Sequence, residues 1–233
     1  MTDVTPDDEF DLPVEPPTPR WQKVLALTVA FVTIAAGAFA VGRFTAFDST
    51  PAAQVPLDSS AEAGFARDMQ THHQQAVQMA MIIYPKTTDA DVRAIAYDIA
   101  TAQSAQVGQM QQWLLDWNLP AYGKAPAMQW MASSGEHSGH GDPSLTPEEL
   151  NAQMGMATQA QLDELAAASG TQADCQFLEL MIRHHEGAID MVDAIEELGT
   201  NHNVLDLAGK MATTQTSEIT AMQMLQSRFG CSD

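Results

Sequence analysis

Apolar side chains recur every three or four residues through much of the chain beyond residue 58, a spacing typical of amphipathic α-helices. The first such stretch places the histidine pair His72 and His73 on its apolar stripe, within an arc of about 120°. Ser59 and Glu62 have the spacing of a capping box at its start, and Pro85 predicts that the helix ends at residue 84. The stripe comprises Phe65, Met69, His72, His73, Ala76, Met79 and Ala80.

A second helix is expected to follow directly. Thr88 and Asp91 resemble an N-cap, and the helical spacing then continues to about Trp117. Two amides, Gln103 and Gln106, lie on its apolar stripe, so polar groups point inward here as well. The sequence therefore predicts a helical hairpin over residues 58–117. The other stripe residues are Ile95, Ile99, Val107, Met110 and Leu114.

Residues 118–146 interrupt this pattern with prolines and glycines and predict a connector loop. The loop holds His137 and His140, which form a second candidate cluster for a soft metal ion together with the methionines around them. The alternative is that these methionines pack on the helices while the two histidines are solvated. The methionines concerned are Met128, Met131, Met154 and Met156.

The second half of the domain, residues 147–229, opens with a strong helix start. Thr146 is expected to cap this helix, with Pro147 at the first helical position, and the helix is expected to end near Gly170. Two longer helices should then cover residues 171–198, ending at a left-handed Gly199, and residues 201–228.

Both halves contain the pattern Met-x-x-His-His-x-x-Ala-(Val/Ile)-x-Met, at an offset of 112 residues. The first copy holds Met69, His72, His73 and Met79, and the second holds Met181, His184, His185 and Met191. The same offset pairs Gln103 with Gln215, Gln106 with Glu218 and Met110 with Met222. We therefore predict that residues 58–229 form a duplicated helical hairpin.

The N-terminal part differs in character. Residues 1–20 are acidic and rich in proline, and we expect a disordered tail on the cytoplasmic side. Residues 21–44 contain an uncharged run close to the length that spans a bilayer, and the basic residues before it favour a cytoplasmic N-terminus with the bulk outside. Residues 45–57 follow as a linker. The alternative is a cleaved signal peptide, for which the small residues at 36–40 are suitable.

Composition supports an all-α fold, because 45% of residues are hydrophobic but only 6% are aromatic. A net charge of −20 argues against a nucleic-acid partner and suits attraction of cations. Cys175 and Cys231 lie near the start of one predicted helix and just beyond the end of the next, and these ends are neighbours in an antiparallel hairpin. We expect a disulfide there, formed outside the cytoplasm, the alternative being two free thiols.

Buried imidazoles and amides are costly unless they are hydrogen-bonded or bind a metal. Imidazole and thioether groups without a thiolate suit copper, particularly Cu(I), whereas the competing interpretation gives the histidines a structural role. The candidate ligands are Met69, His72, His73, Met79, Met110, Met181, His184, His185, Met191, Met222, His137 and His140. Gln103, Gln106, Gln215 and Glu218 are expected to orient the imidazoles.

The stretches Phe-x-x-Asp-Met-x-x-His-His-x-x-Ala at 65–76 and Phe-Leu-x-x-Met-Ile-x-His-His-Glu-Gly-Ala at 177–188 resemble the bacterial family known as domain of unknown function 305. Gln-x-x-Glu-Ile-x-x-Met at 215–222 resembles it too. The resemblance implies a ferritin-like four-helix bundle outside the cytoplasmic membrane. It also implies copper as a candidate ligand, since some members are periplasmic copper-binding proteins.

These observations favour a membrane-anchored, extracytoplasmic copper-binding protein for buffering, resistance or delivery of the metal. The alternative is a non-enzymatic accessory or assembly protein that docks on a membrane-protein complex and whose histidines are structural. We expect no enzymatic activity, because no nucleophile motif stands beside the histidines and the Glu-x-x-His pairs of dinuclear oxidases are absent from both copies.

Overall fold

The structure is a computed structural model that describes residues 19–48, 55–135, 139 and 144–231. All of its regular elements within these ranges are helical, as predicted, and the described residues form no β-strand. The chain separates into two units, Met1–Gln54 and Val55–Asp233, which we describe individually. Most of the predicted tail, residues 1–18, lies outside the described residues, and so do His137 and His140.

The first unit contains one long helix, α1 (Arg20–Asp48). Its segment Arg20–Phe39 has a mean hydropathy of 1.7, and none of the side chains that the structure describes in it is buried within the protein. A helix of this length and composition is able to cross a membrane, and a signal sequence shares the same properties. The predicted anchor, residues 21–44, therefore lies entirely within one helix.

The first hairpin consists of α2 (Ala61–Ile83) and α3 (Ala90–Asp116), close to the predicted bounds. The structure corrects both predicted caps by one residue. Ser60 caps α2 by accepting a hydrogen bond from the backbone N–H of Ala63, and Asp89 caps α3. The Glu62 carboxylate does not complete a capping box, because it instead accepts hydrogen bonds from Thr200 ahead of the last helix.

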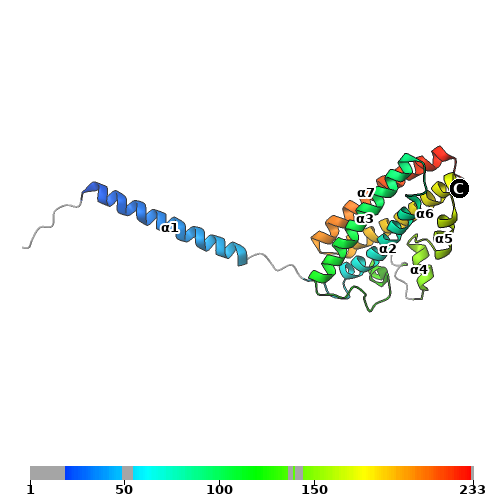
Figure 1. Cartoon of the computed structure of the whole chain (residues 1–233). Coiled ribbons are helices and arrows are strands. Elements are labelled where there is room, and N and C mark those ends of the chain that lie inside the picture. Colours follow the sequence, from blue (N-terminus) through cyan, green and yellow to red (C-terminus); the bar gives the residue numbers. More distant parts are fainter. Residues whose placement is uncertain (1–18, 49–54, 136–138, 140–143, 232–233) are drawn as a thin grey trace, which may run out of the picture. The chain divides into compact units, whose positions relative to one another are not determined.

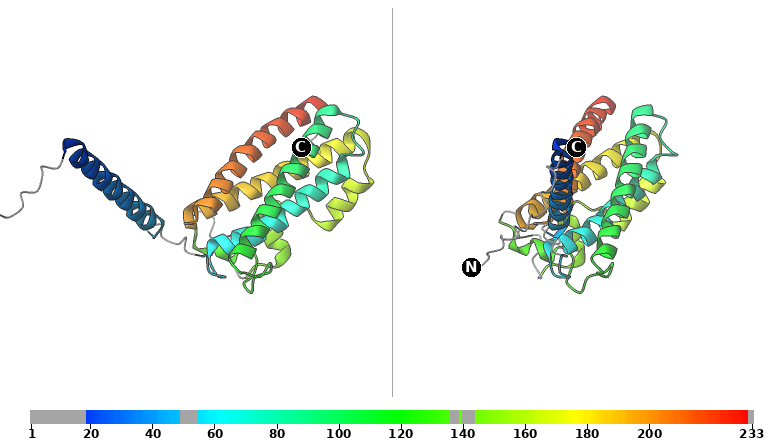
Figure 2. Two further views of the ribbon diagram at one scale, coloured as in Figure 1. Left: turned by 60° about the vertical axis from the view of Figure 1, so that its left-hand side comes forward. Right: turned by 90° about the vertical axis from the view of Figure 1, so that its left-hand side faces the viewer.

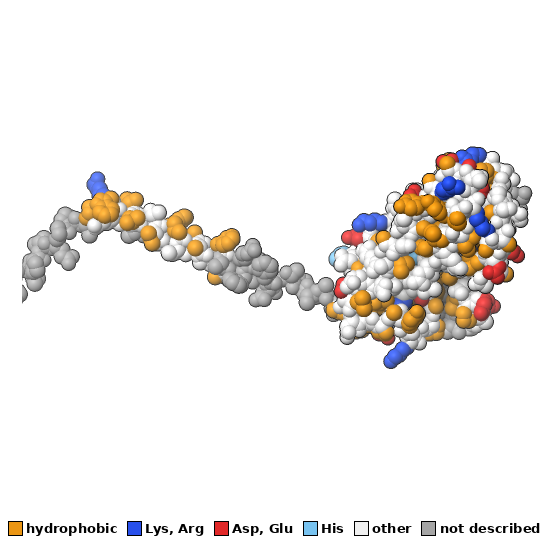
Figure 3. Space-filling model, viewed as in Figure 1, with side chains coloured by type: hydrophobic (Ala, Val, Ile, Leu, Met, Phe, Trp, Pro, Cys, Tyr) orange, Lys and Arg blue, Asp and Glu red, His pale blue; other side chains and the backbone are white. Residues whose placement is uncertain are grey.

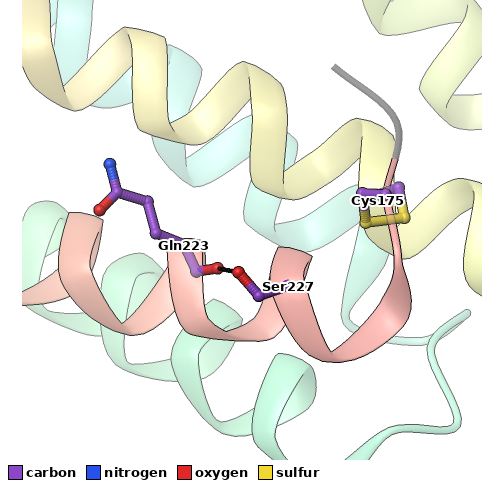
Figure 4. The surroundings of a disulfide bond; sticks show 4 residues. Cys175, Gln223 and Ser227 are labelled. Atoms are coloured by element: carbon purple, nitrogen blue, oxygen red, sulfur yellow. Dashed lines mark hydrogen bonds between the residues drawn. A yellow bond between two sulfur atoms is a disulfide. The ribbon is translucent and has the colours of Figure 1, made fainter.

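The second hairpin consists of α6 (Gly170–Leu198) and α7 (His202–Phe229). Gly199 is extended (φ −82°, ψ 155°), so the predicted left-handed conformation is wrong there; Gly230, after α7, adopts it instead. The predicted disulfide is confirmed, with Cys175 bonded to Cys231 and a Cα–Cα distance of 5.6 Å. Figure 4 shows this bond joining the start of α6 to the chain just beyond α7.

The connector between the hairpins holds the short helices η1 (Gln129–Ser133), α4 (Pro147–Gln153) and α5 (Gln159–Ala167). The capping box at Thr146 is present as predicted. The single helix expected to run to Gly170 is wrong, because the chain breaks between α4 and α5 at Gly155 (φ 67°). A Cβ atom at Gly155 would lie only 2.0 Å from the carbonyl oxygen of Arg183, so a side chain has no room at this crossing of the connector and α6.

Within the second unit, α3 packs on α2, α7 packs on α6, and the two hairpins meet mainly through α2 and α6 (Figures 1 and 2). The inner helices are therefore α2 and α6, and the outer ones are α3 and α7. The connector helices lie along α2 and α6, with α5 contacting both. This arrangement buries the apolar stripes of the two repeat copies against each other.

The core of this unit consists of two separate apolar clusters. The first cluster contains Phe65 and Met69 from the start of α2 and Met191 from the end of α6. The second contains Ala76 and Met79 from later in α2, together with residues from the start of α6. On the four long helices of this unit, the buried side chains between the two clusters are polar, and this polar level contains the histidine pairs.

Candidate functional site

The histidine layer is the polar level between the two apolar clusters. Each of the four long helices contributes one pair of residues to it: His72 and His73 from α2, Gln103 and Gln106 from α3, His184 and His185 from α6, and Gln215 and Glu218 from α7. All four histidines are at least 99% buried. The predicted inward orientation of both His-His pairs is therefore confirmed.

At the centre of the layer the rings of His72 and His184 lie against each other. Their centroids are 3.7 Å apart and the ring planes are inclined by 32°. The two residues occupy equivalent positions in the repeat, on the two inner helices. The central contact thus joins the two halves of the duplication, as expected where α2 and α6 cross.

The outer imidazoles are held by the outer helices. His73 Nε2 donates a hydrogen bond to Gln106 Oε1 (2.8 Å), and His185 Nε2 donates one to Glu218 Oε2 (2.7 Å). These two bonds occupy equivalent positions of the repeat. Gln106 and Glu218 therefore orient the imidazoles as predicted, whereas Gln103 and Gln215 keep side-chain atoms for which no described residue provides a hydrogen bond.

The connector closes the layer beside α2. His72 Nε2 donates a hydrogen bond to the carbonyl oxygen of Met154 (2.9 Å). Gln75 forms two hydrogen bonds with the backbone of Ala157, one through its Nε2 and one through its Oε1. The backbone at Met154 can come this close because α6 has a glycine there: a Cβ on Gly187 would lie 2.0 Å from the Met154 carbonyl oxygen.

These hydrogen bonds determine the tautomers of three histidines. A carbonyl or carboxylate oxygen can only accept, so His72, His73 and His185 carry their proton on Nε2. The Nδ1 atoms of these three rings lie in the buried layer, and no described residue hydrogen-bonds to them. His184 has no such partner at either ring nitrogen. Metal-binding histidines characteristically donate their second ring N–H in this way.

Burial also keeps the imidazoles of His72, His73 and His184 unprotonated. The pKa of His72 is lowered to about 4 and that of His73 to about 3, in both cases mainly because burial disfavours the charged ring. The pKa of His184 is lowered well below its usual value, first by burial and then by the neighbouring His72. At neutral pH these rings are therefore neutral, which is the form that binds a metal.

The six motif methionines are fully buried, but the structure does not bring them together. Met69, Met110 and Met191 belong to the first cluster, whereas Met79, Met181 and Met222 belong to the second. Thioethers thus lie in the clusters on both sides of the histidine layer, three in each. Among the described residues, no three His, Cys, Asp or Glu side chains lie close enough to share one ion.

The predicted second cluster in the connector is only partly described. Met128 and Met131 are buried in the first apolar cluster, which agrees with the alternative that they pack on the helices. Asp68 fixes this segment by accepting hydrogen bonds from the Met128 backbone and the Trp130 indole. Burial raises the pKa of Asp68 to about 6.

Sequence reasoning missed two contributors to the site, the Met154 carbonyl and Gln75. A signal was present, because Gln75 and Gly187 occupy equivalent positions of the repeat but differ in character. The Gln75 side chain hydrogen-bonds to the connector, whereas Gly187 lets the connector backbone approach α6 because it has no side chain.

Comparison with known proteins agrees with this arrangement. The family model "Domain of unknown function (DUF305)" matches residues 62–226. A DUF305 protein from Streptomyces coelicolor, designated a secreted protein, is 39% identical with a TM-score of 0.66, over 76% of this chain and 98% of that chain. A DUF305 fragment from Deinococcus radiodurans is 32% identical with a TM-score of 0.58, over 72% of this chain and 96% of that chain.

A third similar structure is CopM in its Cu(II)-bound form. It is 26% identical with a TM-score of 0.54, over 73% of this chain and 97% of that chain. CopM in its Cu(I)-bound form is 22% identical with a TM-score of 0.53, a likeness that shows the fold alone. No curated protein matches the chain significantly.

Proposed function

The chain belongs to the DUF305 family, and from this premise we propose that it is a membrane-anchored, extracytoplasmic protein that binds copper for buffering, resistance or delivery. The single observation that carries the proposal is the state of the buried histidines. Three of them donate Nε2–H to an oxygen and keep an unpaired Nδ1. Orphaned buried acceptors are costly in a purely structural core and suit a ligand that accepts lone pairs.

The donor types favour copper over harder metals. Both cysteines are consumed by the disulfide, so thiolate ligands are absent. The remaining donors are the buried imidazoles and the thioethers of the flanking clusters, which match the preference of Cu(I) for soft ligands.

Three observations support a location outside the cytoplasm. Helix α1 is long and apolar enough for a membrane anchor. Disulfides such as Cys175–Cys231 persist in oxidising compartments. The similar Streptomyces protein is designated a secreted protein. Residues 45–233 hold 24 Asp or Glu but only 7 Lys or Arg, which adds a general attraction for cations in that compartment.

Cu(I) titration of the full chain in detergent, against a competing Cu(I) chelator, tests the proposal. We expect binding that is lost when His72, His73, His184 and His185 are all replaced by Gln, with helical content confirmed by circular dichroism. Replacing the exposed His202 by Gln is the matched control and should leave binding unchanged. Equal Cu(I) binding by the quadruple variant and the unaltered chain would refute a site in the histidine layer.

A second candidate is an accessory protein with structural histidines. The stacked contact of His72 with His184 favours it, since this contact already fills the centre of the layer. Such a protein should co-purify with a stoichiometric membrane-protein partner in the presence of a metal chelator. The copper proposal does not require such a partner to co-purify.

A further inference from the structure

The outer helices α3 and α7 leave a groove between them. Each packs closely on its own inner helix, but they make little contact with each other. The groove has a volume of about 580 Å³ and lies toward the C-terminal end of α7. Hydrophobic side chains gather along the face that these two helices present in Figure 3. The groove residues that matter below are Asp98 from α3 and Glu218 and Met224 from α7.

Glu218 connects this groove to the buried histidine layer. Its side chain is 15% exposed and lines the groove, while its Oε2 accepts the hydrogen bond from His185, which is fully buried. A cation that reaches Glu218 from solvent is therefore one residue away from a buried imidazole. The Gln103 and Gln215 amides at the same level are buried and are not part of the groove lining.

The outer part of the groove offers donors for a soft cation. Met224 is 64% exposed, whereas the motif methionines are fully buried. Asp98 is exposed on the opposite wall. Arg228 also lines the groove, but it forms ion pairs with Asp89 and Asp91, so its positive charge is offset there. Acidic groups therefore outnumber basic ones along the groove.

The duplication supplies an internal comparison, because the equivalent surface lacks all three groups. At the offset of 112 residues, Lys210 replaces Asp98, Gln106 replaces Glu218, and Gln112 replaces Met224. The two hairpins have thus kept the same buried histidines while only one side carries a thioether and two carboxyl groups. If the histidines were only structural, the two surfaces would have no reason to differ in this way.

We infer that the α3–α7 groove is the access route by which a soft metal cation reaches the histidine layer. Met224 and Asp98 capture the cation at the mouth, and Glu218 receives it beside His185. Glu218 lies six residues before Met224 on α7, about 9 Å along the helix axis. Both line the groove, and exposure falls from 64% at Met224 to 15% at the Glu218 side chain. The inference rests on the proposed copper binding and assigns a direction of access to it.

The test is the rate at which the full chain in detergent takes Cu(I) from a coloured Cu(I)–chelator complex, followed by stopped-flow absorbance. We expect Asp98→Asn and Met224→Gln each to slow uptake, and the double variant to slow it about tenfold, because the first removes a charge that attracts the cation and the second removes a soft donor. The equilibrium affinity should change less than twofold, because neither residue touches the layer. The slowing by Asp98→Asn should diminish at high ionic strength.

Two matched variants serve as controls. Asp206→Asn removes the same charge from an exposed position of α7 outside the groove, and Met81→Gln removes an exposed thioether from α2. Both should take up Cu(I) at the unaltered rate. Equal rates for groove and control variants would overturn the access route while leaving copper binding intact. Absence of Cu(I) binding by the unaltered chain would instead refute the proposed function itself.

Discussion

The imidazole of His72 rests on that of His184 with 3.7 Å between ring centroids, and their hydrogen bonding differs although they are repeat equivalents. His72 donates to the Met154 carbonyl, whereas no described residue hydrogen-bonds to either ring nitrogen of His184. The connector crosses the layer only once, so the duplication cannot give both rings the same partner. This asymmetry leaves His184, like Gln103 of the same layer, without a hydrogen bond from a described residue at either of its side-chain polar atoms.

Replacing His184 by Leu should raise the stability of the metal-free protein, or leave it unchanged, because it removes a buried polar ring without stranding a partner. Replacing His185 by Leu should instead cost about 1–3 kcal/mol, since Glu218 loses its hydrogen-bond donor in a largely buried position. Urea unfolding of both variants measures the contrast. Comparable destabilisation by both substitutions would contradict the hydrogen-bond assignment.

The stability of the metal-free protein should fall as the pH is lowered from about 6.5 toward 4. Burial lowers the folded-state pKa of His72, His73 and His184 below the unfolded value of 6.5, so in this window the unfolded chain binds more protons. Each such histidine contributes a slope of about 1.4 kcal/mol per pH unit. Asp68 has the opposite effect. Its pKa is raised to about 6 in the folded state, so below this pH the folded protein binds one more proton at this carboxyl than the unfolded chain does, which offsets the contribution of one histidine.

Urea unfolding at a series of pH values between 7 and 5 checks this dependence, and His184→Leu is the matched variant. Because that variant lacks one titrating imidazole, its stability should fall less steeply with decreasing pH. A flat profile for the unaltered protein would show that the histidines are accessible to water.

The helices of the fold were predictable because each follows from local spacing and breakers such as Pro85. The break at Gly155 was missed although a local signal was present, because Thr158 and Gln161 form a capping box that begins α5. The backbone contact between Gly155 and α6 required the structure. The inward face of Met69 and Met181 was likewise predictable from periodicity. Periodicity shows which face of a helix a residue lies on, but not which residues of neighbouring helices lie at the same height. The division of the methionines between two clusters therefore required the structure.

Reduction of the Cys175–Cys231 disulfide should destabilise the protein by about 2–4 kcal/mol, because the bond closes a long loop in the unfolded chain (sequence separation 56). Urea unfolding with and without reductant measures the difference, and the Cys175→Ser, Cys231→Ser double variant should behave as the reduced protein does. Protein isolated without reductant should contain no thiol that reacts with a labelling reagent after unfolding. Two reactive thiols per chain would argue against an oxidising location.

The last prediction concerns the contact between the connector and α6. Gly187→Ala should destabilise the protein by about 1–3 kcal/mol, because the added Cβ would lie 2.0 Å from the Met154 carbonyl oxygen and force the connector away. That displacement also removes the acceptor of the His72 hydrogen bond. Gly108→Ala is the matched control, since nothing lies within 4 Å of its added Cβ on an exposed part of α3. This control should gain up to about 1 kcal/mol from helix propensity.

Thermal unfolding of both glycine variants and hydrogen exchange at the connector distinguish the two effects. In Gly187→Ala the amides of residues 154–157 should exchange faster than in the unaltered protein, because this segment is displaced from α6. In Gly108→Ala they should exchange at the unaltered rate or more slowly. Equal stability and equal exchange in the two variants would mean that the connector does not depend on a glycine at position 187 to close the histidine layer.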